Sequence, residues 1–387
     1  MVLLDLNSII SANGLTLNPE YDVKDIRILD GVAYFCGRNT IKNDGFVGHV
    51  KLSDLSGSVP NSVHCYDLRV GPSTIMWRLA AFDDGMGNKR VVSLGNTWYR
   101  GNNAPPFPTC PDSAVCQASF FMEFKVDNDT LVYEYGKVVG DTTRFERADD
   151  LVVTNNWLAI VSRYPDQQAI VIHRCKKYDV QNTFDSYYYY VAPYAEGENH
   201  CCHMKGDTLA DATLYNSGLS SQYESHLRVF DLNSMAMTHA QKFDLLDKTE
   251  PVEPTYMPDY ATLVVLQYQL YPSTMYHHTF VHWKPYNPST YFARLMYENT
   301  DKSLVWMDRL TNRHIVAAGG DYWMMKDISY DDPSTICYTV DQQQVTPLAL
   351  SPMRTAYYNY GAIYRRPNHV KNGVPLSIYI SGSCITP

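Results

Sequence analysis

Short apolar and polar runs alternate along this chain, and one pattern recurs seven times. Each copy has a strand-like run, a tight polar turn and a second run rich in small and β-branched residues, which predicts a β-hairpin. In the first copy the turn Asp30-Gly31 leads into residues 32–37. The other predicted turns are Gly87-Asn88-Lys89, Asn155-Asn156, Lys205-Gly206-Asp207, Pro258-Asp259, Thr311-Asn312-Arg313 and Ser351-Pro352-Met353.

A third strand is predicted after each hairpin, and a fourth after every hairpin except the last. The third strands are expected at 46–52, 120–126, 169–176, 226–231, 279–284, 322–328 and 376–380. The fourth strands are expected at 63–70, 130–135, 187–191, 237–243, 291–296 and 336–340. Because the last copy has no fourth strand of its own, the apolar segments 2–6 and 15–17 are candidates to supply one.

Four-stranded antiparallel units repeated around an axis form a β-propeller, which leaves no long sheet edge exposed. We therefore expect an all-β fold, a seven-bladed β-propeller of four-stranded antiparallel blades, in a single domain spanning residues 1–387. Residues 1–20 are expected to complete the seventh blade, so their deletion should lower the melting temperature sharply.

The repeat resembles the seven-bladed β-propeller superfamily in strand order and spacing over essentially the whole chain. Its tyrosine-rich, irregular copies resemble uncharacterised exported propellers of gut bacteria. The signatures of WD and Kelch repeats do not recur in register. Because propellers serve binding, hydrolysis and scaffolding alike, the resemblance implies an architecture and no activity.

In an antiparallel blade, the loop between the second and third strands lies at the same end as the connection to the next blade. This end is predicted to hold nearly all the long loops, including the one from Gly95 to Gln117, and long loops on a rigid scaffold often carry function. The chain has 31 tyrosines in 387 residues, and amphipathic aromatics beside Arg suit sugar stacking and protein interfaces alike. Packing within the blades also accounts for part of the tyrosine content. The predicted ligand-binding residues are Trp98, Tyr99, Arg100, Tyr164, Tyr271, Tyr364 and Arg365.

Three functions are compatible with this surface. The leading hypothesis is a non-catalytic, exported binding module that recognises a glycan or a protein partner; changing Trp98 and Tyr99 together to Ala should then abolish binding with little change in melting temperature. The alternative is a carbohydrate-active enzyme, a glycoside hydrolase or lyase, that uses two loop carboxylates. The candidate acids are Asp149, Asp150, Glu196, Glu198, Glu250 and Glu253, for which solvated loop positions are the simpler interpretation. The third is a cytosolic scaffold.

The net charge and the sequence motifs exclude several classes of binding partner. The formal net charge of −9 argues against nucleic acid, and no run of 18 apolar residues predicts a membrane span. We expect a monomer without a cofactor. No metal is expected at His200-Cys201-Cys202-His203, because neighbours on a strand point to opposite faces, or at His277-His278.

The cysteines indicate whether the protein is exported or cytoplasmic. The nine cysteines are an odd number, and Cys110 and Cys116 lie in a proline-rich stretch where a disulfide would close a short loop. Cys36, Cys65, Cys175, Cys337 and Cys384 are expected to be buried thiols. The start of the chain lacks signal-peptide features, so we expect either an exported protein, periplasmic or at the cell surface, whose leader has been removed, or a cytoplasmic one.

Overall fold

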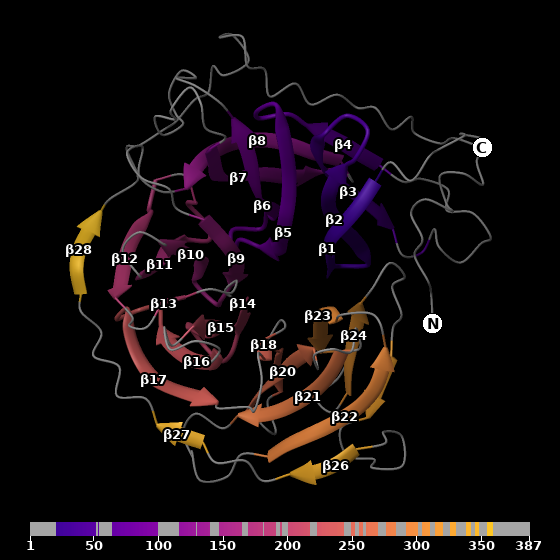
Figure 1. The fold of residues 1–387 in the computed structure, drawn as a ribbon. Helices are drawn as coiled ribbons and strands as arrows, with labels where there is room; N and C mark the ends of the chain where they lie inside the picture. Colours follow the sequence, from indigo (N-terminus) through magenta and orange to yellow (C-terminus); the bar gives the residue numbers. More distant parts are fainter. Residues whose placement is uncertain are drawn as a thin grey trace. The chain divides into compact units, whose positions relative to one another are not determined.

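The computed structural model describes the chain in a series of segments. These are residues 21–51, 53, 64–99, 116–128, 130–139, 147–164, 169–180, 182–190, 194–195, 200–216 and 223–243, followed by the backbone of the strands between 249 and 358. In these segments the chain forms β-strands joined by turns (Figure 1), and no α-helix is present in them. Within the same segments, no helix is long and apolar enough to cross a membrane. The predicted all-β fold is therefore confirmed.

Two four-stranded antiparallel sheets come first in the chain. The first sheet consists of β1 (Tyr21–Leu29), β2 (Val32–Asn39), β3 (Asp44–Lys51) and β4 (His64–Leu68). The second consists of β5 (Ser73–Asp83), β6 (Lys89–Tyr99), β7 (Cys116–Asp127) and β8 (Thr130–Val139). In each sheet the strands lie in sequence order, which is the order that the repeat predicts.

The turn between β1 and β2 shows why the hairpins form where the sequence predicts them. Leu29 pairs with Val32, so only two residues connect the strands. Both have positive φ, 48° at Asp30 and 77° at Gly31. Asp and Gly tolerate this conformation, and a two-residue turn of this kind matches the twist of the paired strands.

The third and fourth sheets repeat the arrangement. The third contains β9 (Arg147–Val153), β10 (Trp157–Tyr164), β11 (Ala169–Lys176) and β12 (Asp185–Tyr190), again in sequence order. The fourth is built on β15 (Thr208–Asn216), β16 (Tyr223–Asp231) and β17 (Ala236–Phe243), with β13 (Tyr194–Ala195) and β14 (His200–His203) both paired to β15. The predicted strand 169–176 coincides with β11, and the predicted turn at Lys205-Gly206-Asp207 joins β14 to β15.

The fifth and sixth sheets are described by their backbone. The fifth consists of β18 (Thr249–Pro251), β19 (Thr255–Met257), β20 (Ala261–Gln269), β21 (Tyr276–Trp283) and β22 (Phe292–Thr300), with β18 and β19 both paired to β20. The sixth consists of β23 (Leu304–Arg309), β24 (His314–Gly319) and β25 (Lys326–Ser329).

The last three strands differ from the sequence prediction. They are β26 (Tyr338–Asp341), β27 (Val345–Pro347) and β28 (Arg354–Tyr358). The strand β26, expected as the fourth strand of the sixth copy, pairs with β22; β27 pairs with β17, and β28 with β12. Each adds to the outer strand of an earlier sheet, because such an edge offers unpaired backbone N–H and C=O groups.

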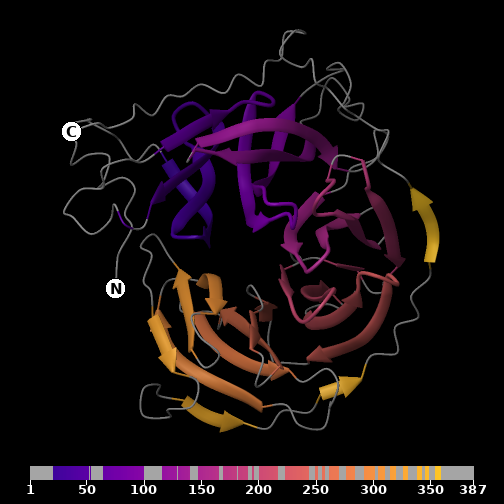
Figure 2. The ribbon, with the colours of Figure 1, turned by 180° about the vertical axis from the view of Figure 1, so that it is seen from behind.

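The first two sheets share one hydrophobic core. Tyr34 and Leu68 of the first sheet and Leu79, Phe120 and Phe124 of the second belong to the same buried cluster. The two sheets are neighbours in both views of the ribbon (Figure 1 and Figure 2). Apolar side chains at alternate positions of β7 bury one face of the second sheet, as strand periodicity requires.

The chain divides into two compact units. One comprises Val2–Val153, Cys175–Ser186 and Tyr358–Pro387, and the other Met1, Thr154–Arg174 and Tyr187–Tyr357. The first two sheets lie in the former unit and the fourth in the latter. The single-domain organisation stays a prediction.

Candidate functional site

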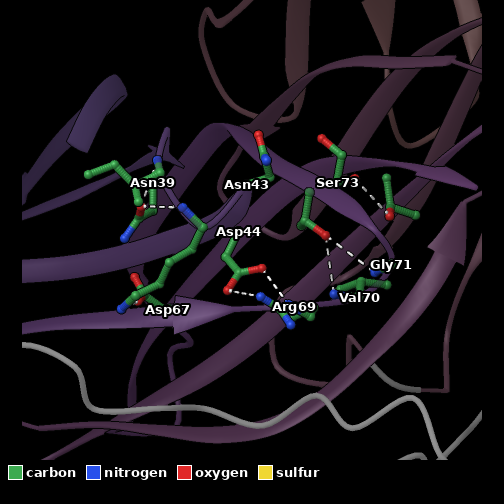
Figure 3. Close-up of polar contacts among 12 residues, drawn as sticks. Asn39, Asn43, Asp44, Asp67, Arg69, Val70, Gly71 and Ser73 are labelled. Atoms are coloured by element: carbon green, nitrogen blue, oxygen red, sulfur yellow. Dashed lines mark hydrogen bonds and ion pairs between the residues drawn. The ribbon is translucent and has the colours of Figure 1, made fainter. Parts of the chain in front are cut away.

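In the first sheet, the loop between β2 and β3 meets the connection from β4 to β5 (Figure 3). The backbone N–H of Thr74 donates to the carbonyl oxygen of Asn43 at 2.8 Å. Arg69 donates to both carboxylate oxygens of Asp44, at 2.7 Å from Nε and 3.1 Å from Nη2. Lys42 Nζ lies 2.8 Å from Asp67 Oδ2. These contacts confirm, for this sheet, the prediction that the two kinds of connection share one end.

The loop of residues 40–43 is held in one conformation by its neighbours. Asn39 is buried, and its side-chain oxygen accepts hydrogen bonds from the backbone N–H groups of Ile41 at 3.2 Å and Lys42 at 3.0 Å. Asn43 adopts a positive φ of 58°, and Arg38 Nη2 donates to its side-chain oxygen at 2.6 Å. The loop is therefore preorganised, which lowers the entropy cost of binding a ligand there.

Opposite charges occupy different depths at this end of the sheet. The acidic side chains are buried, with exposed fractions of 9% for Asp44 and 4% for Asp67. Their partners remain at the surface, where Arg69 is 55% and Lys42 39% exposed. Ile41 at the loop tip is 57% exposed.

The expected loop from Gly95 to Gln117 is shorter than predicted, because residues 95–99 continue β6 and β7 begins at Cys116, with backbone pairing on both sides. Trp98 therefore lies near the end of β6, at the same end of the second sheet. It is half-buried, and its cross-strand neighbours are Ser73 on β5 and Gln117 on β7. Side chains opposite each other in an antiparallel pair lie on the same face of a sheet, so Trp98 shares a face with Ser73. This face is opposite to the one on which Tyr99 enters the core shared with the first sheet. Arg38 of the first sheet reaches the Ser73 hydroxyl at 3.4 Å. We call Arg38, Ile41, Lys42, Arg69 and Trp98 the loop surface.

Close backbone packing holds the connection to β5 against β6. A Cβ atom on Gly71 would lie 2.3 Å from Thr97 Oγ1. The same hydroxyl donates to the Ser73 carbonyl oxygen at 3.1 Å. Only glycine allows this approach, which fixes the segment next to Trp98.

Tyr99 was expected at the ligand-binding surface, and the structure places it in the core. Its side chain is 1% exposed and belongs to the cluster shared by the first two sheets. Burial raises its pKa to about 12. Because truncating a buried aromatic residue costs about 3–5 kcal/mol, the expectation that a Trp98 and Tyr99 double Ala variant keeps its melting temperature is wrong. Trp98 alone is the appropriate position to test.

The other predicted ligand residues cannot be placed on this surface. Tyr164 ends β10, and the structure describes its backbone only. Arg100, Tyr271, Tyr364 and Arg365 lie outside the described residues. The structure therefore places Trp98 at the same end of the first two sheets as Arg38, Lys42 and Arg69, which sequence reasoning missed. The polar run from Asn39 to Asp44 predicts a loop. It does not predict that Lys42 and Asp44 form ion pairs with residues about 25 positions away.

Two of the carboxylates considered for catalysis are not solvated loop acids. Asp149 and Asp150 lie on β9 and are 5% and 1% exposed. Arg147 Nε lies 3.6 Å from Asp149 Oδ1, and Arg78 Nε lies 3.3 Å from Asp150 Oδ1. The expectation of solvated loop positions is wrong for both, because these acids have Arg partners within the sheets. Glu250 lies on β18, described by its backbone, and Glu196, Glu198 and Glu253 lie outside the described residues.

A further buried acid joins the first sheet to the second. Asp25 is fully buried, and its two oxygens accept hydrogen bonds from the backbone N–H groups of Ile26 at 2.7 Å and Leu79 at 2.8 Å. Burial raises the pKa of Asp25 and outweighs the opposite influence of Arg27 and Arg78. Without a solvent-exposed face this carboxyl has a structural role, since it ties β1 to β5.

The histidine and cysteine motifs form ordinary strands. The segment from His200 to His203 is β14, where Cys201 is buried and lies 3.9 Å from Asp211 Oδ1. His203 Nε2 lies 2.9 Å from the carbonyl oxygen of Gly206. In the described part of the chain, no three His, Cys, Asp or Glu side chains form a group that could hold a metal ion. His277 and His278 lie on β21, of which only the backbone is described.

Comparison with known proteins identifies a similar architecture. No family model and no curated protein matches the sequence. The K499G mutant of the NanB sialidase from Streptococcus pneumoniae is similar in structure, with a TM-score of 0.51 and 6% identity over 85% of this chain and 68% of that one.

Two further solved structures are similar at lower scores. NanB in complex with 2-[(3-chlorobenzyl)ammonio]ethanesulfonate has a TM-score of 0.49 and 6% identity over 87% of this chain and 72% of that one. The β-propeller domain of the Trilobed protease from Pyrococcus furiosus has a TM-score of 0.35 and 9% identity over 82% and 97% of the two chains. Identities this low concern the fold alone. The four-stranded antiparallel sheets of this chain are consistent with β-propeller blades.

Proposed function

We propose that this protein is a non-catalytic binding module that recognises a glycan or a protein partner through the loop surface. The observation that carries the proposal is a preorganised loop with exposed Arg69, Lys42 and Ile41, at the same end of the first two sheets as the half-buried Trp98. Tryptophan and arginine dominate the binding energy of interfaces, and an indole also stacks on sugar rings. Preorganised loops on a rigid scaffold are common binding sites.

The proposal includes export to an oxidising compartment. Cys116 is disulfide-bonded, and disulfides persist chiefly in extracytoplasmic compartments. The five other cysteines in the described part of the chain are free, so the partner of Cys116 lies outside that part. We assign Cys110 as the partner because it is six positions away in the sequence. Peptide mapping without reduction should recover the two cysteines in one linked fragment.

Two further features complete the proposal. The binding surface extends to Arg100, Tyr164, Tyr271, Tyr364 and Arg365. The protein acts as a monomer, and its partner is not a nucleic acid, because a net charge of −9 disfavours binding to the phosphate backbone. The sheets belong to a seven-bladed propeller whose last blade residues 1–20 complete. The repeat of the sequence and the four-stranded antiparallel sheets support this architecture.

Replacing Trp98 tests the proposed function. The wild type and Trp98→Ala are compared on a glycan array and in affinity purification against extracellular proteins. Tyr178→Ala is the matched control, because Tyr178 is an aromatic residue with 52% exposure in the turn between β11 and β12. We expect Trp98→Ala to lose at least about tenfold in affinity and Tyr178→Ala to bind like the wild type. Equal binding by the wild type and Trp98→Ala, or no binding by the wild type, would contradict the proposal.

A further inference from the structure

We propose that the ligand of the loop surface is an acidic glycan, an oligosaccharide that carries carboxylate or sulfate groups. This inference rests on the proposed function and names the ligand class of the same site. It follows from the depth at which charges lie, from their fixed geometry, and from the contrast with the opposite end of the same two sheets.

The cations form the outer layer of the loop surface. An approaching ligand meets Arg69 and Lys42, which are 55% and 39% exposed, before Asp44 and Asp67, which are 9% and 4% exposed. Charge interactions weaken with distance and with screening by water and salt. The nearer cations therefore attract an anionic group more strongly than the deeper carboxylates repel it. This arrangement occurs in a chain whose formal net charge is −9.

The buried acids also hold the cations in place. The bidentate contact from Arg69 to Asp44 fixes the plane of the guanidinium group, and Asp67 holds the ammonium group of Lys42. Paired guanidinium groups lose less conformational entropy when they bind a second anion. Arg38 is fixed in a similar way by the side-chain oxygen of Asn43.

The opposite end of these sheets exposes acids. In the turn region between β1 and β2, Asp30 is 61% exposed, and its partner Lys89 on β6 is 44% exposed. Asp83, next to the turn between β5 and β6, is also exposed. Exposed cations above buried carboxylates are therefore specific to the loop end, and ion pairs elsewhere in these two sheets do not all have this arrangement.

The neutral groups of the loop surface favour a sugar over an acidic peptide. Trp98 offers part of an indole ring, and Ser73 and Asn43 place a hydroxyl and an amide beside Arg38. Stacking on an aromatic ring combined with side-chain hydrogen bonds suits a pyranose ring with several hydroxyl groups. An acidic peptide would use the cations and the exposed Ile41, so it is the alternative that the test must include.

Calorimetric titration with four defined probes tests the ligand class. The probes are a galacturonate hexasaccharide, a heparin-derived hexasaccharide, uncharged maltohexaose and hexaglutamate. We expect one or both acidic saccharides to bind, more weakly at about 300 mM than at about 30 mM NaCl because salt screens exposed charges. The first two probes distinguish carboxylate from sulfate recognition. Maltohexaose and hexaglutamate should bind at least about tenfold more weakly.

Charge-neutralising substitutions of both signs make the test sharper. Arg69→Gln and Lys42→Gln should each weaken binding of the acidic saccharide about three- to tenfold. Asp67→Asn should strengthen it, because it removes a deep negative charge and retains an oxygen that Lys42 can reach. Lys89→Gln is the matched control, since it removes a lysine charge of similar exposure, 44% against 39% for Lys42, at the opposite end and should leave affinity unchanged. Thermal melts of each variant verify that the fold is intact.

Several results would overturn the inference. They are absence of binding by both acidic saccharides, tighter binding of hexaglutamate, or an equal loss of affinity in Lys89→Gln and Arg69→Gln. A neutral glycan or a protein that binds through Trp98 without salt dependence would overturn the ligand class alone and leave the proposed function standing. The proposed function and the ligand class would both be contradicted only if no glycan or protein binds in a way that depends on Trp98.

Discussion

Asp84 organises the turn between β5 and β6 with a single carboxylate. One oxygen accepts hydrogen bonds from the backbone N–H groups of Met86 at 2.8 Å and Asn88 at 3.1 Å. The other oxygen accepts hydrogen bonds from Asn88 Nδ2 at 3.0 Å and Arg90 Nε at 2.9 Å. Burial alone would raise the pKa of Asp84, but these hydrogen bonds outweigh it and lower the pKa from 3.8 to about 2. The ionised side chain is thus part of the fold.

We predict that Asp84→Asn destabilises the protein by about 1–3 kcal/mol at neutral pH, the range for hydrogen bonds to a charged group. Because the folded-state pKa is lowered, this stabilisation is complete above the unfolded value and is lost as the pH falls from about 4 to about 2. The difference in melting temperature between wild type and variant should therefore shrink over that interval. Asp83→Asn, at the exposed neighbour, is the control and should have a smaller effect. A constant difference down to pH 2 would contradict this role.

Single residues also show how far the sequence could predict the site. Asp30-Gly31 specifies its turn through local backbone preference, so that turn was predictable. Strand alternation implies that Trp98 and Tyr99 point to opposite faces, and this signal could have placed one of them in the core. The pairing of Arg69 with Asp44 joins residues from different strands, and no local pattern encodes it. The candidate site was predictable in its location and not in its charged residues.

At the scale of elements, a buried ion pair joins β15 and β16 in the fourth sheet. Asp211 and Arg228 are cross-strand partners with fully buried side chains. Arg228 donates to Asp211 through Nε at 2.8 Å and also through Nη2, which donates to Thr213 Oγ1 at 2.7 Å as well. Two charges removed from water depend on each other, so loss of either leaves the other unpaired.

Asp211→Ala should therefore cost about 3–5 kcal/mol, the usual result of breaking a buried pair. A lowered melting temperature in calorimetry checks this. The double variant Asp211→Leu with Arg228→Met removes both charges and should recover most of the loss. If the double variant is as unstable as the single one, packing in the sheet, and not the unpaired charge, determines the cost.

At the scale of the whole molecule, the repeat predicted most strand positions because hydrophobic alternation and turn residues are local signals. The pairing of β26, β27 and β28 with β22, β17 and β12 was not predictable. Short strands of this kind have weak local preferences, and the sheet edge that each joins depends on tertiary structure.

Closure of the propeller remains to be tested by deletion. Residues 1–20 are expected to supply the fourth strand of the last blade, so a chain without them should expose a sheet edge and melt at a markedly lower temperature. Thermal unfolding of the chain starting at residue 21 measures this. A melting temperature equal to that of the full chain would exclude such a closure.

Hydrogen–deuterium exchange measures directly whether the loop surface binds a partner. Exchange is followed peptide by peptide with and without a saturating concentration of a ligand that binds the wild type. If the loop surface binds it, we expect slower exchange of the backbone amides in residues 39–44 and 69–73 on binding, and no such change in Trp98→Ala under the same conditions. Protection confined to the turn at residues 83–88, or none at the loop surface, would contradict the proposed function.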